Sequence, residues 1–143
     1  MDKTRLALIG VGMIGKRHLK AMHNVEEAEL AALVDTVPGV SGLAREWSVP
    51  FFESTDSMLK EIAPDGVIVC TPTEVHLEPV LQSLDAGAHV LVEKPITASL
   101  EEARQIIEKA SATRKQVLVG HHRRHYGILH KTKQLLNDGA LGQ

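Results

Sequence analysis

The chain has 143 residues, a formal net charge of −2 with neutral histidines, and a composition that is 43% hydrophobic and 24% charged. This length suits one domain with a substantial core, and the near-neutral charge excludes the strongly basic proteins that bind nucleic acids through charge alone. The sequence shows no apolar run of membrane-spanning length and no signal peptide, and its single cysteine, Cys70, excludes an intrachain disulfide. We therefore expect a cytoplasmic protein with neither a nucleic-acid nor a membrane partner.

The first predicted element is a strand at residues 6–9, a short and continuously apolar run typical of a parallel sheet covered on both faces. Three glycines with the spacing G-x-G-x-x-G follow directly. Gly10 permits a tight turn out of the strand, Gly12 lets a phosphate approach the backbone, and Gly15 lets the next helix pack close to the sheet.

That helix is predicted at residues 12–24 and starts inside the glycine motif. Its first N–H groups and the positive end of its dipole point toward the position of a phosphate. Met13 and Ile14, in its first turn, are therefore candidate cofactor-binding residues. Taken alone, the motif is a weak signal, and a glycine-containing loop that binds nothing is the alternative.

A second apolar strand, at residues 29–34, ends in Asp35, about twenty residues after the last glycine. This spacing is expected for an acid that accepts hydrogen bonds from the ribose hydroxyls of adenosine. The carboxylate repels a 2′-phosphate, and no arginine follows at Thr36 or Val37, so the sequence favours NAD over NADP. The alternative is that Asp35 is an ordinary turn residue at a strand end.

The rest of the chain alternates between predicted helices and strands. The further strands are predicted at 49–52, near a sheet edge, and at 66–70, 89–92 and 116–119. The further helices are predicted at 40–46, 55–62, 74–85, 99–113 and 124–136. This order predicts an α/β fold with a doubly wound, mostly parallel six-stranded sheet, forming one dinucleotide-binding Rossmann domain over residues 1–143. Ligands of such sheets bind beyond the carboxyl ends of the strands.

The turn after the fourth strand contains several candidate residues. Cys70 closes the strand and is expected to be a buried small side chain, not a nucleophile. Thr71 and Pro72 follow, and the proline stiffens the turn so that it can hold a flat ring against the backbone. Thr73 is predicted to cap the helix that carries His76 in its first turn. A histidine there is as often a structural hydrogen-bonding group as a site residue, so both roles stay open.

Glu93, Lys94 and Pro95 follow the fifth strand, where the reactive end of a bound dinucleotide would lie. A lysine at this position can exchange a proton with a substrate hydroxyl, and Glu93 can orient it. From the pattern alone, a solvent-exposed lysine in a turn is the alternative.

Together these motifs resemble the N-terminal half of the Gfo/Idh/MocA oxidoreductase family. The resemblance rests on Gly10 to Gly15, Asp35, Cys70-Thr71-Pro72-Thr73 with His76, Glu93-Lys94-Pro95, and Gly120 to Arg124. It implies a nicotinamide-dependent dehydrogenase that transfers a hydride between NAD(H) and a hydroxyl carbon of a sugar, cyclitol or related polyol. It also implies that this sequence is the cofactor domain of a longer enzyme, whose substrate domain is absent from this chain and forms a homo-oligomer.

By the same resemblance, Lys94 and His76 are the candidate catalytic residues, and the Lys94–Pro95 peptide bond is expected to be cis. The candidate cofactor-binding residues are Gly10, Gly12, Met13, Ile14, Gly15, Asp35, Thr71, Pro72, Thr73, His76, Glu93, Lys94 and Arg123. The domain alone is expected to bind a dinucleotide with little or no turnover.

Other hypotheses remain open. The resemblance extends to transcriptional regulators that sense a dinucleotide without catalysis, and a scaffold without a ligand is a further alternative. Four histidines near the C-terminal end invite a zinc site, but no cysteine or cluster of carboxylates accompanies them, so no metal is predicted.

Overall fold

The structure, a computed structural model, describes residues 3–140 and 142 and is built around one sheet of six parallel strands. The strands are β1 (Thr4–Ile9), β2 (Ala28–Val34), β3 (Phe51–Phe52), β4 (Gly66–Val69), β5 (His89–Val92) and β6 (Val117–Val119). Their order across the sheet is β3-β2-β1-β4-β5-β6. The chain therefore reverses its direction of winding between β1 and β4, as predicted for a doubly wound fold.

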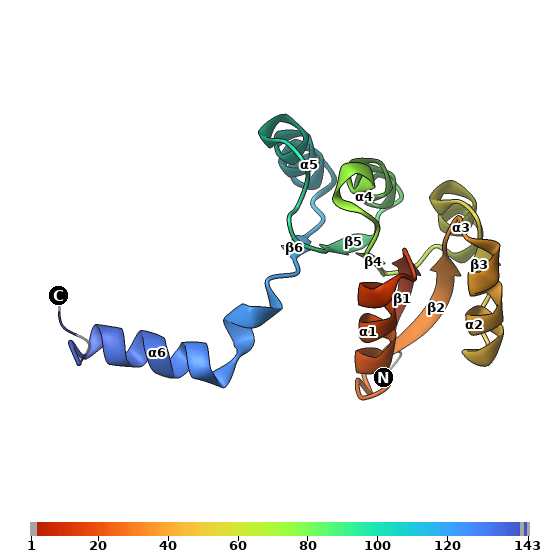
Figure 1. The fold of residues 1–143 in the computed structure, drawn as a ribbon. Helices are drawn as coiled ribbons and strands as arrows, with labels where there is room; N and C mark the ends of the chain where they lie inside the picture. The colour runs from red at the N-terminus through yellow and green to blue at the C-terminus, as the bar shows by residue number, and fades with distance from the viewer. Residues whose placement is uncertain (1–2, 141, 143) are drawn as a thin grey trace.

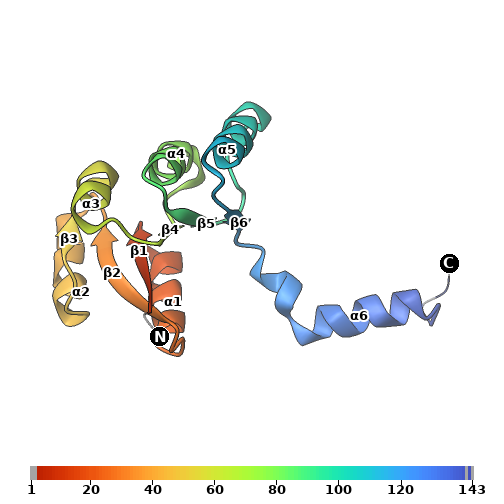
Figure 2. The same ribbon diagram turned by 180° about the vertical axis from the view of Figure 1, so that it is seen from behind.

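Helices cover both faces of the sheet (Figures 1 and 2). The α-helices are α1 (Met13–Met22), α2 (Ser41–Glu46), α3 (Thr55–Ile62), α4 (Leu77–Asp85), α5 (Leu100–Thr113) and α6 (Gly127–Asn137). Short 3₁₀ helices are η1 (Pro38–Val40), η2 (Thr73–Val75) and η3 (His122–His125). α1 and α2 lie on one face, and α3, α4 and α5 lie on the other.

The core has two parts because successive side chains of a strand point to opposite faces of the sheet. On β1, Leu8 packs with Leu19 of α1 in one cluster, while Ala7 and Ile9 pack with residues of α3, α4 and α5 in the other. All three β1 side chains are at most 4% exposed. The continuously apolar run seen in the sequence is thus explained by burial on both faces.

Two predicted helix starts are wrong. Instead of beginning at residue 74, α4 begins at Leu77 with His76 at its N-cap, and Thr73 opens the 3₁₀ turn η2 without capping the helix. Pro79 explains the shift, since it has no N–H and its ring would clash with the carbonyl of Val75 if the helix continued back to that residue. From Leu77, Pro79 falls in the first turn, where a missing N–H costs nothing.

The last helix, predicted at 124–136, begins at Gly127 after the separate turn η3. Tyr126 lies between them with an extended backbone, φ −74° and ψ 130°, which breaks the helical path. α6 extends away from the sheet and is joined to it through η3 (Figures 1 and 2). Within the described residues, α6 and the other helices are all too short or too polar to cross a membrane.

Candidate functional site

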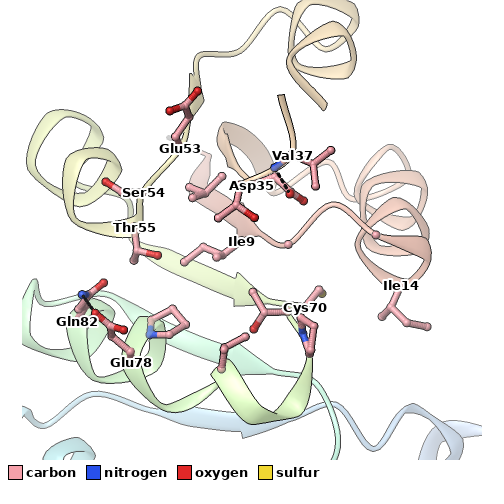
Figure 3. Close-up of a pocket in the computed structure, with 18 of the residues that line it drawn as sticks. Ile9, Ile14, Asp35, Val37, Glu53, Ser54, Thr55, Cys70, Glu78 and Gln82 are labelled. Atoms are coloured by element: carbon pink, nitrogen blue, oxygen red, sulfur yellow. Dashed lines mark hydrogen bonds between the residues drawn. The ribbon is translucent and has the colours of Figure 1, made fainter. Parts of the chain in front are cut away.

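A cavity of about 950 Å³ opens at the carboxyl edge of the sheet, where β1, β2 and β4 end (Figure 3). Seven of the predicted cofactor-binding residues line it, namely Gly10, Gly12, Met13, Ile14, Asp35, Thr71 and Pro72. Gly15, Thr73, His76, Glu93, Lys94 and Arg123 are outside the lining. Of these six residues, Glu93, Lys94 and Arg123 follow β5 and β6, whereas Gly15 lies in α1 and Thr73 and His76 lie after β4.

The three glycines have the geometry predicted from their spacing. Gly10 has φ +87°, and a Cβ there would come within 2.7 Å of the backbone of Cys70 and Thr71. A Cβ on Gly15 would overlap the carbonyl oxygen of Gly10. A Cβ on Gly12, in contrast, would meet nothing within 4 Å, so this glycine leaves open space beside the start of α1.

The start of α1 can bind an anion. Gly12 is its N-cap, with no side chain to accept a hydrogen bond, and no acidic residue lies in the first turn. The first amides of an α-helix have no acceptor within the helix, so those of α1 are available to a ligand. The starts of α3 and α5 differ, because Ser54 and Ser99 accept hydrogen bonds from backbone amides of their first turns.

Thr71 supplies a second observation that points to a ligand. Its Oγ1 is buried and has no hydrogen-bond partner among the residues that the structure describes. A buried hydroxyl without a partner is unfavourable unless a bound molecule or water satisfies it. Because Thr71 lines the cavity, its hydroxyl and the α1 amides fit a polar ligand that spans from the glycine turn to the turn after β4.

Asp35 lies on the same side of the sheet as the glycine turn. Its Oδ2 accepts a hydrogen bond of 2.7 Å from the amide of Val11, and its Oδ1 accepts one of 2.9 Å from the amide of Val37. Each carboxylate oxygen has a second lone pair that can accept from a ligand. Asp35 therefore both fixes the glycine turn and offers acceptors at the edge of the cavity (Figure 3).

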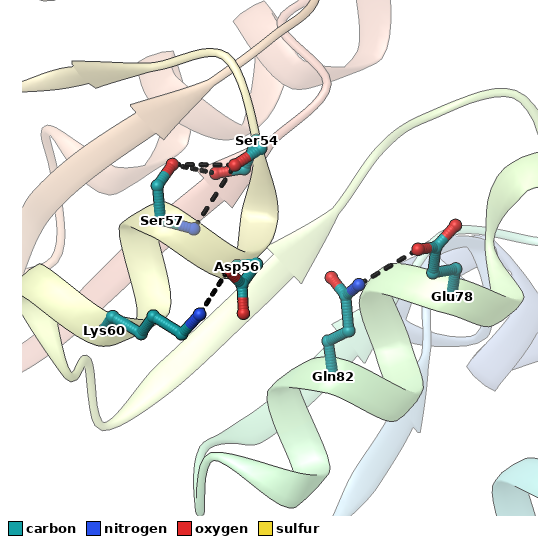
Figure 4. A network of polar contacts seen from close by, with 6 residues as sticks. All are labelled: Ser54, Asp56, Ser57, Lys60, Glu78 and Gln82. Atoms are coloured by element: carbon teal, nitrogen blue, oxygen red, sulfur yellow. Dashed lines mark hydrogen bonds and ion pairs between the residues drawn. The ribbon is translucent and has the colours of Figure 1, made fainter.

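The far wall of the cavity is formed by α3 and α4, and the sequence analysis did not identify it. Asp56 and Glu78 line this wall, and their carboxylates bind Lys60 Nζ at 2.6 Å and Gln82 Nε2 at 3.0 Å (Figure 4). Of the described residues that line the cavity, the charged ones are all carboxylates: Asp35, Glu53, Asp56 and Glu78. No sequence motif marks these wall residues, since their placement depends on how α3 and α4 pack together.

Lys94 is exposed just after β5, and its peptide bond to Pro95 is cis, as predicted. Its backbone amide donates to Oε2 of Glu93 at 3.2 Å. The other oxygen of Glu93 accepts from Nε2 of His18, on α1, at 2.9 Å. The sequence analysis missed His18, which lies 75 positions from Glu93.

Glu93 is a charged residue in a largely buried position, with a side chain that is 12% exposed. Burial alone would raise its pKa, but the hydrogen bonds from His18 and from the Lys94 amide, with the charges of His18 and His122, lower it below 4.5. Burial, together with the charge of Glu93, raises the pKa of Cys70 to about 12. The raised pKa favours the protonated thiol, but Cys70 is only partly buried and lines the cavity, so the prediction of a buried side chain is met in part.

His76 is only 1% exposed and does not reach the cavity lining. Its Nε2 lies 2.9 Å from the carbonyl oxygen of Thr71, and its Nδ1 lies 3.1 Å from that of Pro95 and 3.2 Å from that of Ile96. The ring thus bridges the turns after β4 and β5. Of the two roles that the sequence left open, this geometry supports the structural one.

The C-terminal candidates lie apart from the cavity. Arg123 is exposed in η3, beyond the end of β6. The ring of His122 lies 5.8 Å from that of Tyr126. Within the described part of the chain, no three His, Cys, Asp or Glu side chains gather as metal ligands.

Comparison with known proteins agrees with this geometry. Residues 4–121 match the family model GFO_IDH_MocA, described as an oxidoreductase family with an NAD-binding Rossmann fold. Inositol 2-dehydrogenase of Rhizobium meliloti is 29% identical over 140 residues, covering 97% of this chain and 42% of the relative. The scyllo-inositol 2-dehydrogenase (NAD(+)) of Bacillus subtilis is 31% identical over 144 residues, covering 99% and 42%.

Solved structures show the same similarity. Scyllo-inositol dehydrogenase from Lactobacillus casei, determined with bound NAD(H) and scyllo-inositol, superposes with a TM-score of 0.90 at 27% identity. The match covers 99% of this chain and 43% of that one, so the chain spans less than half the length of the relatives it matches. The family model covers most of the chain and includes the glycine turn, Asp35 and the Glu93-Lys94-Pro95 turn, so this chain belongs to the Gfo/Idh/MocA oxidoreductase family and forms its NAD-binding Rossmann domain.

Proposed function

We propose that this chain is the cofactor domain of a two-domain, NAD-dependent dehydrogenase that acts on a hydroxyl carbon of a polyol, cyclitol or sugar. The observation that carries the proposal is the position of Asp35, whose carboxylate binds the glycine turn at the edge of a cavity of dinucleotide size. The inositol dehydrogenases among its relatives support the substrate class.

The charges around the cavity favour NAD over NADP. A 2′-phosphate on the adenosine ribose would add negative charge beside Asp35, in a cavity whose other charged lining residues are also acidic. Arginine is the side chain that usually accommodates a 2′-phosphate, and the residues after Asp35 are Thr36 and Val37. The two ribose hydroxyls of NAD would instead donate to the free lone pairs of the Asp35 carboxylate.

The residues of this chain have separable tasks in the proposed reaction. The first amides of α1 would hold the pyrophosphate, and the Thr71 hydroxyl and Pro72 would orient the nicotinamide end. The nicotinamide, when bound, supplies the hydride acceptor. As the substrate carbon loses its hydride, the hydroxyl would become a carbonyl and its proton would pass to Nζ of Lys94 in its neutral amine form, which becomes the ammonium, so atoms and charge balance.

Two measurements test the proposal. Isothermal titration of the 143-residue chain should show heat with NAD and weaker heat with NADP, and an absence of heat with both would overturn it. In the complete enzyme, Lys94→Met should lower kcat far more than it raises the Kd for NAD, because the loss falls on the transition state. Lys109→Met is the matched control, since Nζ of Lys109 binds Asp85 on the α4–α5 surface at 2.8 Å.

A protein that senses dinucleotides without catalysis would give a different pattern. It would bind NAD but show no turnover of any polyol, and Lys94→Met would then change nothing measurable. The position of Lys94 at the end of β5, with its amide held by Glu93, favours the enzyme.

A further inference from the structure

The Glu93 carboxylate connects three parts of the fold that are distant in sequence. It accepts from His18 on α1, it accepts from the amide of Lys94, and it packs against Gly120 at the end of β6. A Cβ on Gly120 would lie 3.0 Å from Oε1 of Glu93, so a larger residue there would displace the carboxylate. Glu93 is therefore confined from several sides, and the confined carboxylate is the one that accepts the Lys94 amide.

His18 is the only one of these partners that comes from the helix at the glycine turn. Ile14, four residues earlier and on the same face of α1, lines the cavity. One turn later, that face of the helix contacts Glu93 through Nε2 of His18. α1 thus contacts both the proposed cofactor cavity and the turn that carries Lys94.

We propose that His18 is a positioning residue for Lys94, acting through Glu93 to hold the lysine turn in register with the start of α1. The inference rests on the proposed function, because it needs Lys94 to exchange a proton with the substrate. His18 touches neither the cavity nor the reacting groups, so it acts only through the carboxylate that it holds.

If the role of His18 were purely structural, any side chain that filled the same space against β5 would serve. The hydrogen bond between His18 and Glu93 instead orients the carboxylate. His18 donates to one oxygen of this largely buried group, which leaves the other oxygen to accept from the Lys94 amide. Two titratable groups on other elements are coupled to Glu93 through charge: His122 of η3, which lowers the pKa of Glu93, and Cys70 at the end of β4, whose own pKa Glu93 raises. In the described part of the chain neither group hydrogen-bonds to Glu93, so neither replaces His18.

Two variants separate these roles in the complete enzyme. In His18→Ala, Glu93 loses its partner, and kcat should fall by about tenfold to a hundredfold, since a misplacement of about 1 Å can cost that much. The Kd for NAD should stay unchanged, because His18 does not line the cavity. His18→Gln keeps an amide donor at similar reach and should recover most of kcat. His23→Ala is the control at the C-cap of the same helix, as His23 is exposed and packs edge-on against Trp47.

Equal losses of kcat in His18→Ala and His18→Gln would overturn the proposal, because they would show that packing, not the hydrogen bond, is what matters. An unchanged kcat in His18→Ala would overturn it as well. Hydrogen exchange of the Lys94 amide in the 143-residue chain gives an independent readout, and it should become faster in His18→Ala but not in His18→Gln. Lys94→Met is measured alongside: if it leaves kcat intact, the proposed function fails, whereas if only the His18 variants leave it intact, the positioning role fails.

Discussion

Replacing Asp35 with alanine should weaken NAD binding strongly and reduce the preference for NAD over NADP. The substitution removes the carboxylate that would accept hydrogen bonds from the adenosine ribose. It also removes the acceptors of the Val11 and Val37 amides, at 2.7 and 2.9 Å. The effect on binding therefore has a direct part, from the lost ribose contacts, and an indirect part, from a looser glycine turn.

The direct part can be estimated from the hydrogen bonds. A hydrogen bond to a charged acceptor contributes about 1.5–3 kcal/mol, so losing the two ribose contacts should cost about 3 kcal/mol when each is taken at the low end of that range. Since 1.4 kcal/mol corresponds to a tenfold change in Kd, NAD should bind about a hundredfold more weakly. NADP should lose less, because the same substitution removes the negative charge that faces its 2′-phosphate.

The assay is titration calorimetry of the 143-residue chain with each dinucleotide, with Asp65→Ala as the matched control. Oδ2 of Asp65 also accepts a backbone amide, that of Arg5 at 2.8 Å, but Asp65 precedes β4 and lies at the opposite edge of the sheet. Both variants should lose some stability in urea, and only Asp35→Ala should lose affinity for NAD. Equal affinities for NAD in the two variants would refute the assignment of Asp35.

Three further predictions concern stability and reactivity. His76→Ala should lower the free energy of unfolding by about 3 kcal/mol in urea denaturation, because it leaves a cavity and deprives two turns of their shared partner; a loss below about 1 kcal/mol would contradict the bridging role. With its pKa raised to about 12, Cys70 should react with a disulfide reagent at pH 8 far more slowly in the folded chain than in the denatured chain, and similar rates would contradict the raised pKa. The lowered pKa of Glu93 means that its ionised form stabilises the fold above pH 4.5 and that this contribution is lost as the pH falls toward the folded-state pKa, so acid should destabilise the wild type more than Glu93→Gln. If the wild type and Glu93→Gln lose the same free energy of unfolding between pH 6 and pH 3, this role of Glu93 is contradicted.

The elements that could be predicted are those whose limits are set by neighbouring residues. The bounds predicted for the helix at 55–62 and the strand at 89–92 agree with α3 and β5. The helix predicted at 99–113 agrees with α5 within one residue, and Ser99 caps it, with its Oγ accepting from the amide of Glu102 at 3.2 Å. Residues at the ends of a helix or strand act on the backbone next to them, so these predictions do not depend on the rest of the fold.

The sequence also contains the information needed to predict where α4 begins. Pro79 excludes an unbroken helix that starts at residue 74, and Thr73 therefore cannot be its cap. The start of α6 is harder, because no residue near Tyr126 forbids a helix. The extended backbone of Tyr126 depends on the path that the chain takes through η3 away from the sheet. The pattern of apolar residues in the sequence does not encode that path.

The two ends of the site differ in how far the sequence determines them. At the adenosine end, the glycines and Asp35 lie within one β-α-β unit, so their spacing along the chain largely fixes their spacing in the structure. At the Lys94 end, the groups come from α1, β4, β5 and β6, and His18 and Glu93 meet only because the doubly wound order places β4 and then β5 next to β1, the strand that leads into α1. Cofactor binding should therefore tolerate changes at the Lys94 end, while the orientation of Lys94 should respond to substitutions on α1 that leave the cavity untouched. Local sequence motifs can identify a dinucleotide fold of this kind, but the residues that position its proton-transfer group have to be found from the packing.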